Sequence, residues 1–448
     1  MDRERKNLLP TPFSIAVLLT FITFILALFL KEPTIKENHL IELLSSWEKG
    51  LWNPPLLVFA LQMMLMLVIG HVVALSEPID SLIKKITVYC KNTAISAAII
   101  TFFTVFVALF NWGLGLIFGA IFARKVGEHA IKNKINLNYP LIGAAGYSGL
   151  MVWHGGISGS APIKIAESGH FLEEKIGVIS QAETIFSSMN ILTSLLLLII
   201  LPIFMYYLGK KNNTNNINLD ISKKEKISEK IKGVEKIKGV EKIDHSKILA
   251  YIFGGLILFF SFYKAFIIPD NISLKIITPN YINFVLLGTA LVMHKNFYNF
   301  LEAVNNAIKG ASGILIQFPL YFGIMGIMSE SGMIEMMSTF FVNISNETTF
   351  PIFTFFSAGI VNIFIPSGGG QWAVQGPIII EAANQLAVSI PKSVMALAYG
   401  DQITNMLQPF WALPLLGITG LKASEILPYT IKLFLIGIII FISVLLIF

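Results

Sequence analysis

Apolar segments of about 20 residues recur from residue 13 to the last residue of this 448-residue chain. A helix of that length spans the hydrocarbon core of a bilayer. Charged residues make up only 13% of the chain, against about 25% in a typical globular protein. No large soluble domain remains between the apolar segments. We therefore predict an all-α polytopic membrane protein with about 10–12 hydrophobic segments.

Residues 2–6 are all charged, and the apolar run after them is longer than a typical signal-peptide core and lacks a small-residue cleavage site. We expect this run to be the first membrane helix, with the N-terminus in the cytoplasm. The net charge of +6 comes from Lys and Arg beside the apolar runs, which indicates membrane topology and not nucleic-acid binding. The predicted membrane segments are 13–30, 55–75, 94–122, 139–153, 184–208, 248–268, 281–293, 311–329, 349–365, 373–390, 394–418 and 428–447.

Residues 93–123 are predicted to form a re-entrant hairpin. Basic residues cluster at 84–91 and at 124–134, so both flanking loops should be cytoplasmic. The run between them is broken by Asn111-Trp112-Gly113 and is too short for two full crossings. The amphipathic piece at 39–47 is expected to be an interfacial helix in an outer-face connection.

Residues 209–247 differ sharply from their surroundings because they are Lys-rich, begin with an Asn-rich stretch and contain a tandem IKGVEK repeat at 231–242. We predict a flexible basic cytoplasmic linker. It separates two membrane repeats, 1–208 and 248–448, which we expect to be inverted repeats with re-entrant or broken helices.

Two Gly/Ser-rich helix breaks resemble each other in the order of their features. Residues 151–167 read MVWHGGISGSAPIKIAE, and residues 363–381 read IFIPSGGGQWAVQGPIIIE. Such backbone at membrane depth is tolerated only where protein shields it or where it lines a polar cavity. Broken helices expose free N–H groups and positive dipole ends, which bind small anions such as carboxylates. Gly-mediated helix contacts or kinks are the alternative explanation.

Several other polar residues are candidates for recognition or coupling. Lys164 could attract an anion, or it could snorkel or pair with Glu167. His154 could relay protons or be a satisfied interior histidine. Glu183, Glu381 and Asp401 could carry protons or bind sodium, or simply lie at helix ends.

The segment 401–411 reads DQITNMLQPFW and is unusually polar for a stretch between apolar helices. Thr404, Asn405 and Gln408 can share one helical face, either in a site or in a hydrogen-bonded seam between helices. Trp153, Trp372 and Trp411 flank these motifs and could line a pocket, although tryptophan is also common at membrane interfaces.

Motifs for ATP hydrolysis, metalloprotease and serine-hydrolase chemistry are absent from the sequence. The single Cys90 excludes an intramolecular disulfide and a cysteine-rich metal site. We expect no catalytic residues, no bound metal and no cofactor apart from a coupling proton or sodium ion.

Three segments together carry a family resemblance: WHGGISGSAPIKIAESG at 153–169, PSGGGQWAVQGPI at 366–378 and GDQITNMLQPFWALPLLGI at 400–418. They closely resemble the bacterial short-chain fatty acid transporter family (AtoE type). The hydrophobic layout fits over most of the chain, and the linker at 209–247 belongs to none of the motifs. The wider plan is similar to the ion-transporter superfamily.

The resemblance implies a multi-pass protein of the bacterial inner membrane that imports short-chain carboxylates such as butyrate or acetoacetate. It also implies paired re-entrant hairpins, an elevator-type movement and symport with a proton or sodium ion. Membrane lipid is an expected partner, and the plan is compatible with a homodimer. The substrate-binding residues that it suggests are Ser158, Gly159, Ser160, Ser367, Gly368, Gly369, Gly370, Gln371, Thr404 and Asn405.

Two other functions stay open from the sequence alone. A passive channel for small anions would show no counter-ion dependence. A membrane-embedded enzyme acting on acyl groups would need a nucleophile beside a base, and Ser158 or Ser160 with His154 is the only nearby candidate.

Overall fold

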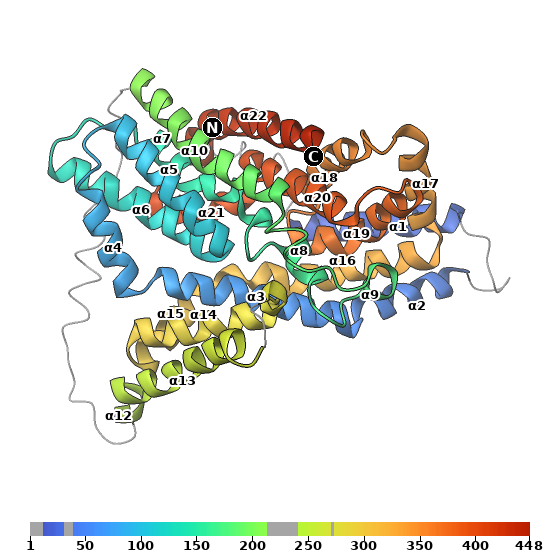
Figure 1. The fold of residues 1–448 in the computed structure, drawn as a ribbon, viewed down its shortest axis with the longest axis horizontal. Helices are drawn as coiled ribbons and strands as arrows, with labels where there is room; N and C mark the ends of the chain where they lie inside the picture. The colour runs from blue at the N-terminus through green and yellow to red at the C-terminus, as the bar shows by residue number, and fades with distance from the viewer. Residues whose placement is uncertain (1–11, 31–38, 213–240, 270–272) are drawn as a thin grey trace.

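The computed structural model describes residues 12–30, 39–212, 241–269 and 273–448. These residues form helices and connecting loops without any strand, which confirms the all-α fold class (Figure 1). The predicted linker at 209–247 and its repeat lie mostly outside the described residues. The helices of the first half are α1 (Pro12–Leu30), α2 (His39–Leu51), α3 (Pro54–Ala74), α4 (Glu77–Thr87), α5 (Thr93–Phe110), α6 (Trp112–Lys132), α7 (Tyr139–Tyr147), η2 (Ser148–Met151), η3 (Trp153–Gly155), α8 (Ser160–Ile165), α9 (Glu173–Ile176) and α10 (Ser188–Lys211).

The second half is also helical throughout its described residues. Its helices are α12 (Glu241–Asp244), α13 (Lys247–Phe266), η4 (Leu274–Ile276), α14 (Pro279–His294), α15 (Phe297–Ala307), η5 (Ile308–Gly310), α16 (Ser312–Glu330), α17 (Met333–Ile344), α18 (Phe350–Phe364), α19 (Gly368–Gln385), α20 (Ile390–Thr404), η6 (Asn405–Leu407), α21 (Pro409–Thr419) and α22 (Ala423–Ile447).

Every predicted membrane segment falls on one to three helical elements, but few of these helices are uninterrupted spans. Among the described residues, five are long and apolar enough to cross a membrane, namely α3, α5, α10, α13 and α22. A sixth span is reached if the bent pair formed by α15 and α16 counts as one. Most of the other helices are shorter because the chain turns back or breaks, as expected where half-helices form a site.

Each half contains a helical hairpin with a capped tip. In the first, Asn111 ends α5 and begins α6, and its side-chain oxygen accepts a hydrogen bond of 2.7 Å from the N–H of Leu114. In the second, Ser367 caps α19 by accepting a bond of 3.3 Å from the N–H of Gly370. Asn and Ser are favoured caps because they satisfy first-turn N–H groups that lack intrahelical partners. The structure therefore contains a helical hairpin at 93–123 and extends its second arm to Lys132. Helix α5 alone is long enough to cross a membrane, so the re-entrant course stays a prediction.

A broken helix follows each hairpin. After α5 and α6, helix α7 gives way to η2, η3 and an irregular stretch before α8. After α18 and α19, helix α20 gives way to η6 and then α21. A long helix follows in both cases, α10 in the first half and α22 in the second, so the order of elements repeats.

This order corrects the match between residues 151–167 and 363–381. The first stretch belongs to a broken helix and the second to a hairpin tip, so they are not equivalent positions of the repeat. They look alike in sequence because each contains Gly/Ser-rich backbone immediately before a helix, α8 in one case and α19 in the other.

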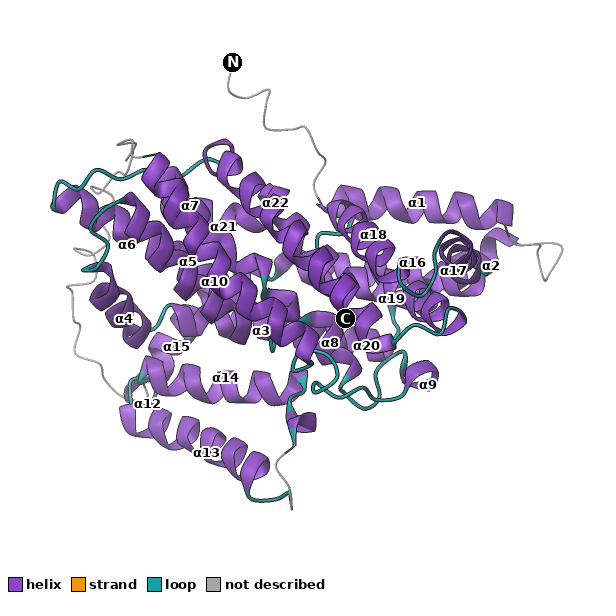
Figure 2. Cartoon of the chain, turned by 45° about the horizontal axis from the view of Figure 1, so that its top comes forward, coloured by secondary structure: helices purple, strands orange, loops and turns teal. Residues whose placement is uncertain are grey.

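Helix α3 lies in the middle of the molecule in both views, with α13 and α14 on one side and α5, α6 and α10 on the other (Figures 1 and 2). It contacts α6, α14 and α16 directly. Helix α2, expected to be an interfacial helix in an outer-face connection, packs along α16. Gly323 and Gly326 of α16 allow this approach, because a Cβ on either would lie 2.6 Å or less from Trp47 or Ser46.

Helices α6 and α7 touch through two facing glycines. A Cβ added to Gly119 would lie 2.0 Å from the carbonyl oxygen of Gly146, and one added to Gly146 would lie 2.5 Å from the carbonyl oxygen of Gly119. This contact joins the first hairpin to the first broken helix. Small residues at such crossings let membrane helices approach closely.

We predict that Gly119→Val destabilises the protein by about 3 kcal/mol or more, because backbone on the facing helix cannot move aside for a side chain. Gly255→Val is the matched control, since no atom lies within 4 Å of a Cβ at that position of α13. Thermal unfolding of purified protein in detergent measures both. Equal melting temperatures for the two variants would contradict the close α6–α7 contact.

Candidate functional site

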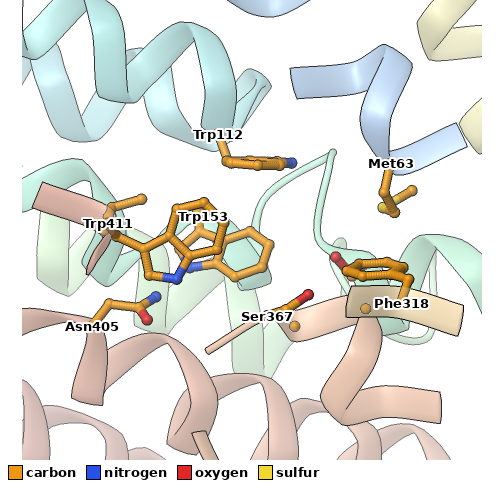
Figure 3. Close-up of a pocket in the computed structure, with 11 residues that line it drawn as sticks. Met63, Trp112, Trp153, Phe318, Ser367, Asn405 and Trp411 are labelled. Carbon is orange, nitrogen blue, oxygen red and sulfur yellow. The ribbon is translucent and has the colours of Figure 1, made fainter. Parts of the chain in front are cut away.

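The two helix breaks singled out in the sequence meet at one pocket (Figure 3). The space between its lining residues, including its open mouth, amounts to about 340 Å³. Both hairpins, both broken helices, α3 and α16 contribute side chains to it. The lining residues are Met63, Trp112, Leu150, Trp153, Ser160, Phe318, Ser367, Gly368, Gly369, Asn405 and Trp411.

The N-terminus of α19 forms one polar part of the pocket. Gly368 and Gly369 are the first two residues of this helix, so their N–H groups have no acceptor within it. Ser367 holds the tip in place through its bond to the N–H of Gly370. The macrodipole of an 18-residue helix adds partial positive charge at this end. The arrangement suits a small anion.

Ser160 and Asn405 supply further donors from the two broken helices. The Ser160 hydroxyl lines the pocket and has no hydrogen-bond partner within the described part of the chain. The Asn405 side-chain oxygen accepts a bond of 3.0 Å from the amide of Asn362. Because its oxygen is occupied in this way, the side-chain amide NH2 group of Asn405 is the donor that is left for a ligand.

Aromatic residues form much of the apolar wall. The ring centroid of Trp112 lies 5.7 Å from that of Trp153 and 5.4 Å from that of Trp411 (Figure 3). The buried indole N–H groups of Trp112 and Trp153 have no partner within the described structure. Met63 and Phe318 line the pocket from α3 and α16. The pocket therefore combines hydrogen-bond donors with a short apolar surface.

His154 and Asp401 form a buried pair beside the pocket. His154 is 0% exposed and Asp401 is 1% exposed, and Nδ1 of the imidazole lies against Oδ2 of the carboxylate. The other ring nitrogen, Nε2, accepts a hydrogen bond of 3.1 Å from the N–H of Ala161. The indole of Trp153 stacks on the imidazole, with 4.5 Å between the ring centroids.

Hydrogen bonds from buried amides hold the breaks in shape. The side-chain oxygen of Gln402 accepts bonds from the N–H groups of His154 (2.9 Å) and Gly155 (3.2 Å). The amide of Asn190 donates a bond of 2.8 Å to the carbonyl of Gly155. Asn362 donates to the carbonyl of Asp401 at 2.7 Å. These bonds satisfy backbone groups that the irregular stretches leave unpaired.

Lys164 is paired and does not line the pocket. Its ammonium group lies 2.7 Å from the Glu167 carboxylate, 3.3 Å from the side-chain oxygen of Gln62 and 5.5 Å from the ring centroid of Phe59. Glu167 also accepts a bond of 3.1 Å from the amide of Asn280. This network links α8 to α3 and α14, which is the pairing alternative anticipated from the sequence.

Five of the ten residues suggested for substrate binding line the pocket, namely Ser160, Ser367, Gly368, Gly369 and Asn405. The others support it. The Ser158 hydroxyl accepts a bond of 3.0 Å from the N–H of Trp112, and Gly159 caps α8. Gly370 packs against Tyr321, whose ring atoms would lie 2.6 Å from an added Cβ.

The remaining two residues of that set make contacts within the protein. Gln371 donates bonds of 2.9 Å to the carbonyl of Ala358 and to the side chain of Gln375. The Thr404 hydroxyl accepts a bond of 2.9 Å from the Asn362 amide.

The other two acidic candidates lie away from the pocket. Glu183 is exposed and accepts a bond from the N–H of Ser180. Glu381 lies 3.4 Å from Lys175, with a third of its side chain exposed. Trp372 is fully buried against Phe171 and is not among the lining residues.

Sequence reasoning missed Met63, Trp112, Leu150 and Phe318 as lining residues. Trp112 had a usable signal, since it follows Asn111 at the break that indicated the first hairpin. The other three are ordinary apolar residues of helices in a chain with 35 Phe and 15 Met, so nothing local distinguished them. Within the described ranges, no group of His, Cys, Asp and Glu could hold a metal ion.

Comparison with known proteins identifies the family. The family model described as short chain fatty acid transporter matches residues 2–448. A relative from Escherichia coli K12 is 36% identical over 444 residues, covering 99% of this chain and 97% of the relative. A relative from Haemophilus influenzae is 37% identical, covering 96% of both chains. Both are provisionally named short-chain fatty acid transporters.

Two solved structures share the fold across nearly the whole chain. MtrF of Neisseria gonorrhoeae, from a class of antimetabolite efflux pumps, is 14% identical with a TM-score of 0.56, covering 99% of this chain and 96% of MtrF. The YdaH transporter of Alcanivorax borkumensis is 12% identical with a TM-score of 0.59, covering 98% of both. The relatives are transport proteins and not enzymes. This chain belongs to the short-chain fatty acid transporter family.

Proposed function

We propose that this protein imports short-chain carboxylates such as butyrate and acetoacetate across the bacterial inner membrane, driven by a proton or sodium gradient. The supporting observation is that two helix breaks, more than 200 residues apart in sequence, meet at one pocket that is lined by both hydrogen-bond donors and apolar side chains. A short fatty acid has the same two-part chemistry, because a carboxylate is attached to a few methylene groups.

In this proposal the carboxylate lies at the N-terminus of α19, near the hydroxyl of Ser160 and the side-chain amide NH2 group of Asn405. The N–H groups of Gly368 and Gly369 would donate hydrogen bonds to the carboxylate. Because this acceptor is charged, these bonds would be stronger than bonds to a neutral acceptor. The acyl chain lies against Met63, Phe318 and the tryptophans. Burial of one methylene contributes only about 0.8 kcal/mol, so the carboxylate contacts provide most of the selectivity for acids.

We further propose that the hairpins and broken helices move together as an elevator. Ser158 bonds the first break to the start of α6, Gln402 bonds it to α20, and Asn362 bonds α18 to η6. These bonds join both hairpins and both breaks into one unit. The network of Lys164, Gln62 and Asn280 links that unit to α3 and α14 and would have to rearrange during movement.

Proteoliposomes containing the purified protein test the proposal. Labelled butyrate and acetoacetate should accumulate when a proton gradient or a sodium gradient is imposed separately, after subtraction of uptake by protein-free vesicles. Saturable uptake that responds to neither gradient would instead favour a passive channel for small anions. Uptake equal to that of protein-free vesicles would contradict both functions.

We predict that Asn405→Asp raises the apparent KM for butyrate at least about tenfold, because a carboxylate replaces a donor beside the substrate carboxylate. The change is nearly isosteric, and the new side chain can still accept the bond from Asn362. Ser160→Ala should weaken uptake in the same direction but less. Asn299→Asp, on exposed surface of α15, is the control and should transport normally. Unchanged uptake by Asn405→Asp would remove this residue from the site.

We predict that Phe318→Ala shifts the preference from butyrate toward hexanoate, because it extends the apolar end of the pocket. Two more buried methylenes contribute about 1.6 kcal/mol, which corresponds to a gain of about tenfold for hexanoate relative to butyrate. Phe322→Ala is the matched control, since that ring is equally buried one turn along α16 but does not line the pocket. Competition between the two acids for uptake of labelled butyrate measures the shift. An equal preference in both variants would exclude Phe318 as the limit on chain length.

A further inference from the structure

We propose that the buried His154–Asp401 pair is the proton-binding site that couples import to the proton gradient, so that one proton enters with each carboxylate. This inference rests on the proposed function, because it identifies the coupling ion and its place. It uses groups beside the pocket that do not themselves line it.

The hydrogen bonds of His154 define the protonation state of the pair. Because Nε2 accepts the N–H of Ala161, it carries no proton in this structure. Nδ1 and Oδ2 of Asp401 therefore share one proton between them. The pair then holds one net negative charge. The second carboxylate oxygen, Oδ1, is buried and has no partner within the described structure, which leaves it open to a second proton.

The surroundings do not neutralise this charge. On α8 and just after it, Lys164 and Glu167 neutralise each other and face α3. On α20, the hydroxyl of Tyr399 bonds to Asn190 of α10. The groups that face the pair from α19 and α18 are the glycine Gly368 and the neutral amide of Asn362. Burial of a charge without an opposite partner is costly, so the pair has reason to take up a proton.

Gly368 connects the pair to the pocket. It lines the pocket, and a Cβ built on it would lie 2.8 Å from Cε1 of His154 and 3.0 Å from Oδ2 of Asp401. A substrate carboxylate at the N-terminus of α19 therefore adds a second negative charge next to the pair. Repulsion between like charges favours protonation, so the substrate strengthens proton binding, and by linkage the proton strengthens substrate binding.

The same contact controls access to the pair. With exposures of 0% and 1%, His154 and Asp401 cannot exchange protons with water in this conformation. The tip of the α18–α19 hairpin covers them through Gly368. Movement of the tip would expose substrate and proton to the same side of the membrane, as symport requires.

Calorimetric titration of the full-length protein with butyrate tests the proposal. The protein is in detergent, so neutral butyric acid that crosses a lipid bilayer cannot disturb the measurement. Buffers with different ionisation enthalpies give the number of protons taken up. The wild type should take up about one proton per butyrate, and its Kd should rise as the pH is raised, because proton binding and butyrate binding are linked. Asp401→Asn should bind butyrate with no proton uptake and with a Kd independent of pH. Glu381→Gln should behave as the wild type.

The outcomes separate this inference from the proposed function. Butyrate binding by the wild type without proton uptake would overturn the role of the pair and leave carboxylate transport intact. If the Asp401→Asn variant still takes up a proton with butyrate, the coupling proton binds at another group and the proposal is wrong. If Asp401→Asn does not fold, Asp401→Ser also removes the carboxylate and provides the same comparison. Absence of any butyrate binding by the wild type would count against the proposed function itself.

Discussion

The fold depends on the requirement that backbone N–H and C=O groups find partners away from water. A continuous helix meets this requirement by itself, but a break does not. At each break, side chains satisfy the backbone groups that the helix leaves unpaired. Asn111 and Ser367 act as helix caps. Gln402 accepts hydrogen bonds from the N–H groups of both His154 and Gly155. The buried amides and hydroxyls around the pocket are therefore first of all structural. The polar groups that make no hydrogen bond within the protein are the ones available to a ligand.

That division explains how much of the site the sequence could predict. Helix breaks have a local signal, because Gly, Ser and Pro in an apolar run are conspicuous, and Gly368, Gly369 and Ser160 were found in this way. No local sequence signal shows whether a given polar residue stabilises the break or lines the pocket. Ser158 and Ser160 are two positions apart and chemically identical, yet one bonds to the N–H of Trp112 and the other faces the pocket.

The larger fold shows the same limit. Hydropathy located the helices, but it could not distinguish a full crossing from half of a hairpin, so twelve predicted segments correspond to five or six long spans among the described residues. The resemblance between 151–167 and 363–381 reflected shared chemistry at a helix start and not equivalent positions. Lys164 was equally ambiguous, because only the folded structure brings Gln62 and Asn280, from distant segments, to its partner Glu167.

The ion pair of Lys164 has a consequence for how an anion can be held. Among the lining residues there is no cation, so recognition of a carboxylate relies on a helix N-terminus, a hydroxyl and an amide. Such contacts are weaker than a buried ion pair, and a weaker hold suits a carrier that must release its substrate on the other side. A site of this kind, placed beside a negative pair, is unfavourable for an anion alone. In the coupling that we propose, binding becomes favourable when a proton arrives with the anion. The absence of a cation in the pocket and the presence of His154 and Asp401 would then both make import of the anion depend on a proton.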